Sequence, residues 1–309
     1  MKRLPIGAAL TALLLAGCAP ATDVAPSAPR IAAGAVKPDG RINGDPALWM
    51  LKDADTTIYL FGTVHVLRPD IDWFDGPVKT AFDASGELML EMVEPEGAVA
   101  QTTVQRIAED PDGPALTAKM SPALRAKYVA AMGRAKLPVA GFEKLEPWFV
   151  ASLLALMPLE QLGYSGANGA EAVLTRTAKS SGKRIAGLET FEQQLGFFDG
   201  LSEPVQIRFL ESTIDEQVNL AKSFATLIAQ WSRGDADGLG AEITRQLRDI
   251  PEVGKVLLTD RNARWAAQLD DRMDRPGAVF VAVGAGHLAG ADSVQRMLVG
   301  RGFTVTRLQ

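Results

Sequence analysis

The sequence predicts an α/β protein that is mostly helical around a small mixed β-sheet. Two observations indicate this class. Short apolar runs that read as buried strands lie near both ends of the chain, at residues 57–61 and 278–283, while helical patterns dominate the region between them. Each of the two runs is followed by a Gly-x-x-His motif, which contains His65 in one case and His287 in the other. We therefore expect both motifs at the carboxyl ends of strands, with a helical insertion between them.

Residues 1–17 are predicted to be a lipoprotein signal peptide. Lys2 and Arg3 give it a positive start, and the apolar stretch that follows is too short to span a bilayer. It ends in Leu-Ala-Gly followed by Cys18, a pattern that resembles the bacterial lipobox. In lipoproteins with this motif the cysteine is lipidated and becomes the first residue. The alternative is an ordinary secretory signal with a chance cysteine.

The composition excludes several kinds of chemistry. Cys18 is the only cysteine, so the mature chain has no internal disulfide, no catalytic thiolate and no thiolate ligand for zinc. Removal of residues 1–17 deletes two positive charges and takes the formal net charge from −5 to −7, which argues against nucleic acid as a partner. Residues 18–44, rich in Ala, Pro and Gly, read as the lipidated cysteine and a flexible tether, and residues 45–309 as the folded domain.

The folded domain begins with a predicted hairpin, in which residues 47–51 and 57–61 pair across a polar turn, and a further apolar strand covers residues 88–92. The middle is helical, because its segments start at capping residues or prolines and carry apolar residues at helical spacing. The expected elements that follow are a helix that begins at Pro122, helices over 147–157, 169–180, 202–231 and 254–273, a strand over 184–188, and a last unit of strand 278–283, helix 290–300 and strand 303–308.

His65 and His287 are the only histidines in the chain, and they stand in the same strand-and-turn context. Ligands of open α/β sheets bind at the carboxyl edge of the strands. We therefore expect the two imidazoles to converge on one site, closer together than the roughly 12 Å beyond which they could not share even a bridging metal. Their neighbours are glycines and small residues, so each ring should be partly accessible. The alternative is that both are structural histidines satisfied in the core.

Two glutamates occupy comparable positions. Glu91 lies inside an apolar run at residues 88–93, where a carboxylate is costly unless it is paired or coordinated. Glu189 follows the short strand at residues 184–188. The alternatives are a salt-bridged rim residue or a helix N-cap, and for the second glutamate the polar residues that follow it suit the start of a helix.

Arg261 lies on a predicted helix, four residues before Trp265, so the two side chains share a face. An arginine there could hold a carboxylate of the site or an oxyanion of a substrate. The alternative is an ion pair on the helix surface.

Three motif glycines, Gly62, Gly284 and Gly286, should let the chain turn sharply at the strand ends and bring backbone N–H groups near a ligand. They do not form a phosphate-binding loop, because no Lys-Ser/Thr follows and no Gly-x-Gly-x-x-Gly is completed. The chain also lacks a Gly-x-Ser-x-Gly elbow and a His-Glu-x-x-His helix.

Taken together and in order, several motifs resemble the TraB/GumN family over about residues 46–309. The motifs are Leu60-Phe61-Gly62-Thr63-Val64-His65-Val66, Leu162-Gly163-Tyr164, Gly187-Leu188-Glu189-Thr190, Asp260-Arg261-Asn262 and Val283-Gly284-Ala285-Gly286-His287-Leu288-Ala289-Gly290. One position departs from the family. After Leu-Gly-Tyr the family often has Gly-hydrophobic-Asp, whereas this chain has Gly169-Ala170-Glu171, which keeps the carboxylate on a side chain one methylene longer.

That family is similar to the Tiki proteins, membrane-tethered metal-dependent proteases, and looks related to the erythromycin-esterase and ChaN-like folds. The resemblance implies an α/β core with a site between the two Gly-x-x-His loops. It implies a divalent ion, such as Mn, Co or Zn, held by His65, His287 and one or two glutamates, with Glu91 and Glu189 as the candidates. A glutamate not bound to the metal would be the general base.

Two functions of different classes follow. The first is a metal-dependent hydrolase, peptidase-like, that acts in the cell envelope on a peptide or small-molecule substrate. The second is a non-catalytic envelope lipoprotein that uses the same cleft to bind a small ligand, peptide or metal. In both, a lipid on Cys18 anchors the protein to a membrane. Because Ala19 and not aspartate follows the cysteine, we expect the outer membrane, with the body in the periplasm.

Overall fold

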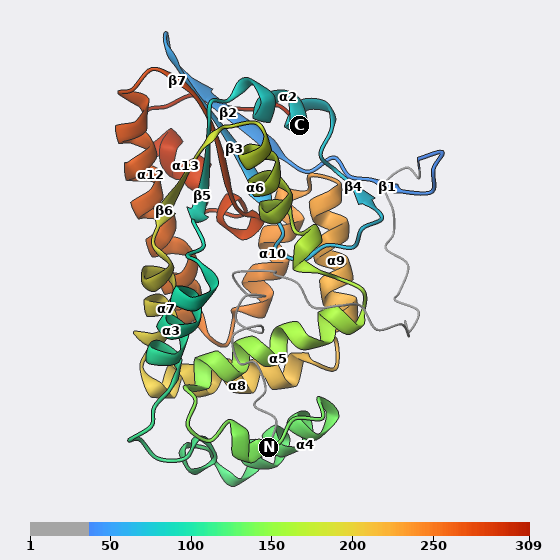
Figure 1. Ribbon diagram of the computed structural model, residues 1–309, viewed down its shortest axis with the longest axis vertical. Coiled ribbons are helices and arrows are strands. Elements are labelled where there is room, and N and C mark those ends of the chain that lie inside the picture. The colour runs from blue at the N-terminus through green and yellow to red at the C-terminus, as the bar shows by residue number, and fades with distance from the viewer. Residues whose placement is uncertain (1–36) are drawn as a thin grey trace.

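The computed structural model describes residues 37–309 (Figure 1). The predicted signal peptide, Cys18 and most of the predicted tether lie outside the described residues. The strands are β1 (Ile42–Asn43), β2 (Leu48–Lys52), β3 (Thr56–Thr63), β4 (Ile71–Asp72), β5 (Glu87–Met92), β6 (Arg184–Glu189), β7 (Gly277–Gly284) and β8 (Val305–Arg307). The α-helices are α2 (Gly76–Ala84), α3 (Gly97–Ala108), α4 (Pro122–Arg134), α5 (Pro147–Gln161), α6 (Ala170–Ser180), α7 (Phe191–Asp199), α8 (Glu203–Glu216), α9 (Leu220–Ser232), α10 (Ala236–Gln246), α11 (Pro251–Gly254), α12 (Asp260–Met273) and α13 (Val294–Gly300). Shorter helical turns are η1 (Leu116–Lys119), η2 (Val139–Gly141), η3 (Gly166–Asn168), η4 (Lys255–Thr259) and η5 (Ala285–Leu288).

The main sheet has six strands in the order β6-β5-β7-β3-β2-β8. The first four are parallel to one another, whereas β2 runs antiparallel to both of its neighbours. The predicted hairpin is confirmed, with Leu48 opposite Phe61 and Lys52 opposite Thr57. A small second sheet pairs β1 with β4 in parallel. The predicted class, a mostly helical α/β protein around a mixed sheet, is therefore confirmed.

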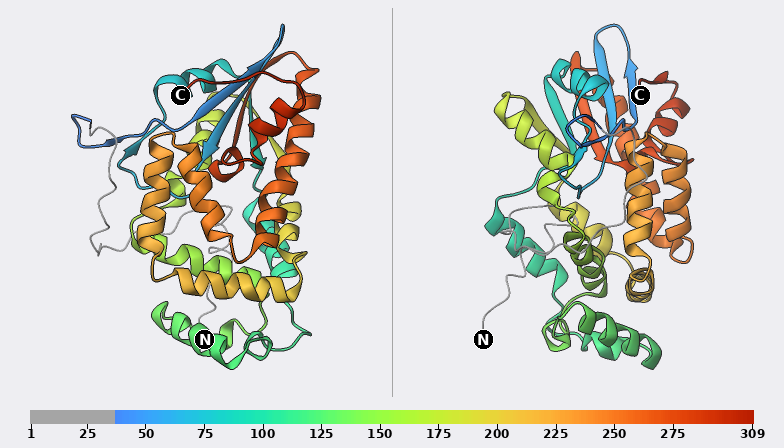
Figure 2. Two further views of the ribbon diagram at one scale, coloured as in Figure 1. Left: turned by 180° about the vertical axis from the view of Figure 1, so that it is seen from behind. Right: turned by 90° about the vertical axis from the view of Figure 1, so that its right-hand side faces the viewer.

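Helices cover both faces of the main sheet, because its strands are apolar on both sides. On one face, Phe61 packs in a cluster with Phe82 of α2 and Leu174 of α6. On the other face, Leu60 packs with Trp265 of α12 and with apolar residues of α13. Figures 1 and 2 show the sheet at one end of the molecule with these helices on either side.

The opposite end of the molecule is a separate helical layer with its own apolar core (Figure 1). Helices α3, α4, α5, α7 and α8 pack there around Tyr128, Trp148 and Phe149, all of which are fully buried. The sequence marks the starts of these helices as predicted. The Ser121 hydroxyl caps α4 by accepting from the Leu124 N–H, and α5 begins at Pro147. The carboxyl ends of the parallel strands point towards this layer, so the edge where the motifs lie is covered by helices.

Two predicted helices differ from the expected ones. The helix expected over residues 202–231 is two helices, α8 and α9, separated near Val218, whose side chain is 86% exposed. The apolar residues keep their helical spacing through this point, but Val218 has no packing partner among residues 37–309. The apolar face therefore does not stabilise one continuous helix. The helix expected over residues 254–273 is continuous but begins earlier, at Pro251 of α11, and it contains the π-helical turn η4 before α12.

The folded body begins earlier than predicted. The composition predicts residues 37–44 as part of the flexible tether, yet Ile42 pairs with Ile71 in the small sheet. The Lys37 ammonium forms ion pairs with Asp72 and Asp75, at 2.7 Å and 2.6 Å. These contacts order a segment whose composition alone predicts a flexible tether. No helix within residues 37–309 is long and apolar enough to cross a membrane.

Candidate functional site

The two histidines meet at the carboxyl edge of the sheet. Strands β3 and β7 are adjacent and parallel, with Thr63 opposite Gly284, so the loops that follow them leave the same edge. A Cβ placed on Gly284 would lie 3.8 Å from Nε2 of His65 and 3.6 Å from Cδ2 of His287. The sum of these two distances is an upper limit for the separation of those two atoms, and it is well below the roughly 12 Å limit for a shared metal site.

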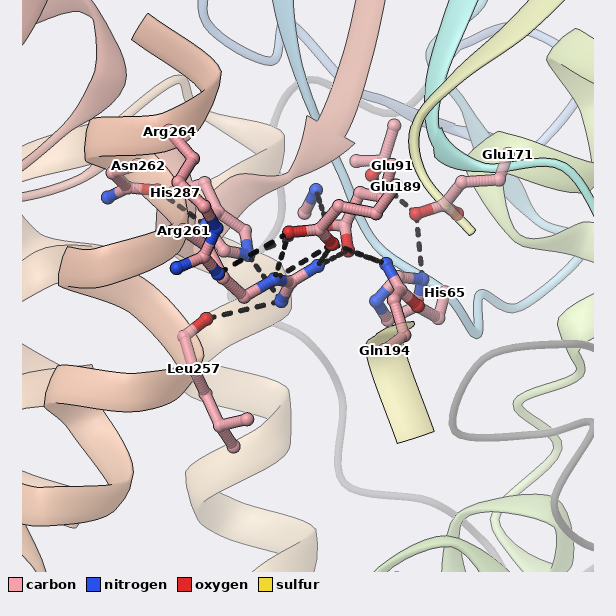
Figure 3. Close-up of polar contacts among 12 residues, drawn as sticks. His65, Glu91, Glu171, Glu189, Gln194, Leu257, Arg261, Asn262, Arg264 and His287 are labelled. Carbon is pink, nitrogen blue, oxygen red and sulfur yellow. Dashed lines mark hydrogen bonds and ion pairs between the residues drawn. The ribbon is translucent and has the colours of Figure 1, made fainter. Parts of the chain in front are cut away.

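His65 is partly exposed and is oriented by a carboxylate (Figure 3). Its side chain is 39% exposed, and its Nδ1 lies 2.7 Å from Oε1 of Glu171 in the first turn of α6. The same carboxylate oxygen accepts a hydrogen bond from the Thr63 hydroxyl. Gly169 allows α6 to start this close, since a Cβ there would meet the carbonyl oxygen of His65 at 2.0 Å. The longer Glu171 side chain therefore still reaches the histidine.

His287 is buried, which corrects the expectation that both rings would be partly accessible. It is 4% exposed and lies against the Trp265 ring, with centroids 4.3 Å apart. Its Nδ1 is 2.6 Å from Oδ1 of Asn262, whose amide nitrogen donates to the Asp292 carbonyl. This network assigns the proton to Nδ1 and leaves the lone pair on Nε2, which lies 3.2 Å from Nη1 of Arg261. The small neighbours in sequence did not predict burial because α12 supplies the covering side chains.

Glu91 comes from β5 and faces both histidine loops. Its Oε1 accepts from the Gly284 N–H at 2.7 Å and lies 3.6 Å from Nε2 of His287. Its Oε2 accepts from Nη2 of Arg261 at 2.6 Å and from the Gln194 amide at 3.0 Å. The carboxylate that looked costly in an apolar strand is thus fully paired.

Glu189 is the last residue of β6 and is held by Arg261. The arginine donates to it from Nε at 3.0 Å and from Nη2 at 2.8 Å, and the Gln194 amide adds a longer contact at 3.3 Å. The N-cap of the next helix is Thr190, which forms a capping box with Gln193. The N-cap alternative therefore does not apply to Glu189.

Arg261 is the centre of the charged cluster and not a surface ion pair. It is 7% exposed and stacks on Trp265 with 4.6 Å between the guanidinium carbon and the ring centroid, which confirms that the two side chains share a face. Its Nη1 also donates to the carbonyl of Leu257 in the π-helical turn η4. Burial alone would lower the pKa of Arg261, but Glu91 and Glu189 outweigh it and raise the pKa above its usual value.

The three motif glycines act through close approach. None of the three has a positive φ angle, so the backbone conformation of a sharp turn does not require glycine at these positions. A Cβ on Gly62 would lie 3.1 Å from Cα of Ala285, and one on Gly286 would lie 3.0 Å from the Ile243 side chain. At Gly284, a Cβ would lie 3.0 Å from Oε1 of Glu91. Gly284 also donates its backbone N–H to the Glu91 carboxylate, as expected.

The two imidazoles titrate in opposite directions from the ordinary histidine value of 6.5. Burial alone would lower the pKa of His65, but the Glu171 carboxylate outweighs it and raises the pKa to about 9. Burial lowers the pKa of His287 to about 3, even though Glu91 acts against this shift. Burial would raise the pKa of Glu91, yet the Arg261 guanidinium holds it far below its usual range. At neutral pH the metal-free site therefore contains a protonated His65, a neutral His287 and an ionised Glu91.

Because the chain has only two histidines, NMR can follow both rings without ambiguity. In metal-free protein we expect His65 to titrate near pH 9 and His287 to stay neutral until about pH 3. The stabilisation from protonated His65 is present below pH 6.5 and is lost as the pH rises through about 9. For His287 the unfolded chain takes up the proton first, so stability is lost as the pH falls from 6.5 towards 3. Glu171→Gln should lower the pKa of His65; two rings that both titrate near 6.5 would contradict this electrostatic account.

Several residues of the site were not predicted. Gln194 bridges the two glutamates, Asn262 orients His287, and Thr63 shares Glu171 with His65. Asn262 directly follows Arg261 within a recognised motif, which was a usable signal. Nothing in the sequence singles out Gln194, which the first turns of α7 bring to the site. Within residues 37–309, no group of three or more His, Cys, Asp and Glu side chains is placed to hold a metal ion.

The comparisons with known proteins agree with these motifs. A model of the TraB/PrgY/gumN family matches residues 47–307, which is most of the chain. The uncharacterized protein YbaP of Escherichia coli (strain K12) is 27% identical over 151 residues, or 49% of this chain and 55% of YbaP, and YbaP of Shigella flexneri matches to the same extent. The chain thus spans about half the length of these curated relatives. No solved structure matches. This chain belongs to the TraB/PrgY/gumN family.

Proposed function

We propose that this chain is a metal-dependent hydrolase of the bacterial cell envelope that acts on peptide-like substrates. One observation carries the proposal: both histidines have Nδ1 bound to an oxygen acceptor, so that each Nε2 faces the site, where Nε2 of His287 lies 3.2 Å from Nη1 of Arg261. The acceptors are Glu171 for His65 and Asn262 for His287, at 2.7 Å and 2.6 Å. Metal-binding histidines are typically held in this way, because the outer acceptor fixes the tautomer and the ring orientation.

The donor set fits a divalent ion in type. Imidazole nitrogens and a carboxylate oxygen are the usual ligands of catalytic zinc and similar ions. Oε1 of Glu91 and Nε2 of His287 are 3.6 Å apart, a spacing that bonds of about 2 Å to one ion can bridge. Gly284 lets the backbone approach them closely, since a Cβ there would lie 3.0 Å from Oε1 of Glu91. His65, His287 and Glu91 are therefore the candidate ligands by chemistry, and of these the Glu91–His287 pair has a suitable spacing, whereas the described residues do not place three such groups around one point.

A bound divalent ion would polarise a carbonyl group and lower the pKa of bound water. The chain's own residues have separate tasks. Glu91 turns Oε1 towards the two histidines, because Arg261 and Gln194 hold its other oxygen. Glu189 accepts from Arg261 and Gln194 and so acts as a positioning residue. Arg261 is a fixed buried cation next to this carboxylate pair, suited to stabilise negative charge that develops in a reaction.

The hydrolase assay uses purified full-length protein and a set of fluorogenic peptides. We expect cleavage that stops when the protein is treated with a chelator and returns when Mn, Co or Zn is added. His65→Ala should not cleave under any of these conditions. Cleavage that survives chelation would contradict a metal-dependent reaction. Metal binding without cleavage of any peptide or ester would instead support the binding lipoprotein.

Gly284→Ala tests whether the close approach of the backbone at Gly284 to Glu91 is needed. The added Cβ would lie 3.0 Å from Oε1 of Glu91, so the carboxylate must move away from the histidines. We expect at least about a tenfold loss of hydrolysis, since misplacing a reacting group by about 1 Å can cost a factor of roughly a hundred. Gly196→Ala is the control, because a Cβ there meets nothing within 4 Å on helix α7. If both variants keep full activity, the space beside Gly284 is not part of the reaction site.

The envelope location is part of the same proposal and rests on the sequence before residue 37. The lipobox-like Leu-Ala-Gly-Cys pattern supports a lipid on Cys18, and Ala19 after it supports the outer membrane. The Cys18→Ser protein should no longer be cut after Gly17 and should carry no lipid. Processing at Gly17 with retention in the membrane would contradict the anchor.

A further inference from the structure

Arg264 is an oriented cation at the rim of the site. It lies one turn after Arg261 on α12, and its guanidinium stands 4.7 Å from the centroid of the Phe197 ring on α7. Its side chain is 46% exposed. Stacking on an aromatic face restricts a guanidinium while leaving its N–H donors free at the edge. The solvent-accessible Arg264 is therefore held in place by a neighbouring helix.

The charge of Arg264 has no close partner among residues 37–309. One carboxylate oxygen, Oε1 of Glu189, lies within 4.0 Å, and at 3.8 Å it is too far for a hydrogen bond. Glu189 is already taken by Arg261, which donates two short hydrogen bonds to it. The inner guanidinium thus balances the buried carboxylates, and the outer one lies beside them, partly exposed and with unused donors.

Gln194 offers the complementary group, an unused acceptor. Its amide nitrogen donates to Glu91 and Glu189, and because both partners only accept, the orientation of the amide is fixed. Its Oε1 is buried and has no hydrogen-bond partner among the described residues. A buried acceptor without a donor costs free energy, so we expect an N–H group or a water molecule to donate to this oxygen. Gln194 and Phe197 are three residues apart on α7 and therefore lie on the same side of that helix.

We infer that the substrate is a peptide with a free carboxylate close to the scissile bond, and that Arg264 binds this carboxylate. The Gln194 oxygen accepts an N–H of the same peptide. This inference rests on the proposed function, and it adds the substrate class. It also explains how an anionic substrate can approach a site lined by Glu91 and Glu189, because Arg264 supplies the positive charge at the rim. Arg264 is then a substrate-binding residue, positioned by Phe197.

The test compares two probes, N-acetyl-L-alanyl-L-alanine and its C-terminal amide, on full-length protein. Calorimetry measures the affinity of each probe for the wild type, Arg264→Gln and Phe197→Leu. The control is Arg208→Gln, an arginine of similar exposure on α8 whose partner is Glu252. We expect Arg264→Gln to bind the acid probe about tenfold more weakly and the amide unchanged, because one charge-assisted contact is lost. Phe197→Leu should weaken the acid probe in the same direction, and Arg208→Gln should change neither.

The outcomes test carboxylate binding by Arg264 and hydrolysis separately. Equal affinity of the wild type for acid and amide, or equal loss of both in Arg264→Gln, overturns the carboxylate inference. Inorganic phosphate that binds through Arg264 more tightly than the acid probe also overturns it, in favour of a phosphorylated ligand. Chromatography of the titrated samples shows separately whether the peptide has been cut. Arg264-dependent binding without any cleavage would keep this recognition site and contradict the hydrolase.

Discussion

Replacing Arg261 by methionine is expected to lower the free energy of unfolding by about 3–5 kcal/mol, the cost of breaking a buried ion pair by removing one partner. The side chains of Arg261, Glu91 and Glu189 are 9%, 10% and 4% exposed, so methionine would leave two buried carboxylates without their cation. Urea denaturation at pH 7, followed by tryptophan fluorescence, measures the loss.

The cause can be separated from a simple packing effect by pH. Ionised Glu91 contributes stability above its ordinary pKa of 4.5, and this contribution is lost as the pH falls through its lowered folded-state pKa. The deficit of Arg261→Met should therefore shrink below about pH 4.5, and adding Glu91→Gln and Glu189→Gln should recover part of it. Arg208→Met on the surface should stay within about 0.5 kcal/mol of the wild type. A deficit that does not change with pH would show that lost packing, and not unpaired charge, is the cause.

Alanine at His65 and at His287 should abolish hydrolysis alike but affect stability differently. His65 is 39% exposed and paired with Glu171, so its loss removes a partly screened ion pair and should cost up to about 1 kcal/mol at neutral pH. His287 is buried against Trp265 and bonded to Asn262, so its loss leaves a cavity and an unsatisfied amide and should cost about 1–3 kcal/mol.

Activity assays and thermal unfolding of the two alanine variants are compared with His287→Gln. Glutamine can still hydrogen-bond to Asn262, and we expect it to restore part of the stability but none of the hydrolysis. Full activity in His65→Ala would remove this residue from the reaction. Unfolding of both alanine variants at room temperature would instead support the view that the histidines are structural.

Much of the fold could be predicted because its strands are short apolar runs bounded by turn residues. The hairpin, the strand that carries Glu91 and the two strands before the histidines all appear where expected. The sequence predicts that β3 and β7 end at the same edge of the sheet but not that they pair directly. The paired residues lie more than two hundred positions apart in the sequence. The break at Val218 and the π-helical turn η4 depend on what the neighbouring helices cover, which a one-sided apolar stripe does not reveal.

The residues of the site could likewise be predicted only in part. The sequence predicts His65 and His287 as site residues because each follows a strand in the same motif, and Glu91 because its carboxylate lies inside an apolar strand near the strand's carboxyl end. Arg261 was found on its helix, but its burial was not, because the two glutamates that hold it come from other parts of the chain. Gln194 carries no local signal at all. Its role is set by the position of α7 after β6, which places it between the two carboxylates.

The most direct test of this account is the metal content of purified wild-type protein beside His65→Ala, with thermal unfolding recorded on the same samples. We expect one divalent ion per chain in the wild type and a rise in its melting temperature when the ion is added to metal-free protein. Both should be lost in His65→Ala, because a ligand stabilises only the state that binds it. A wild type that binds no divalent ion at micromolar concentration, or an alanine variant that keeps it, would contradict the account.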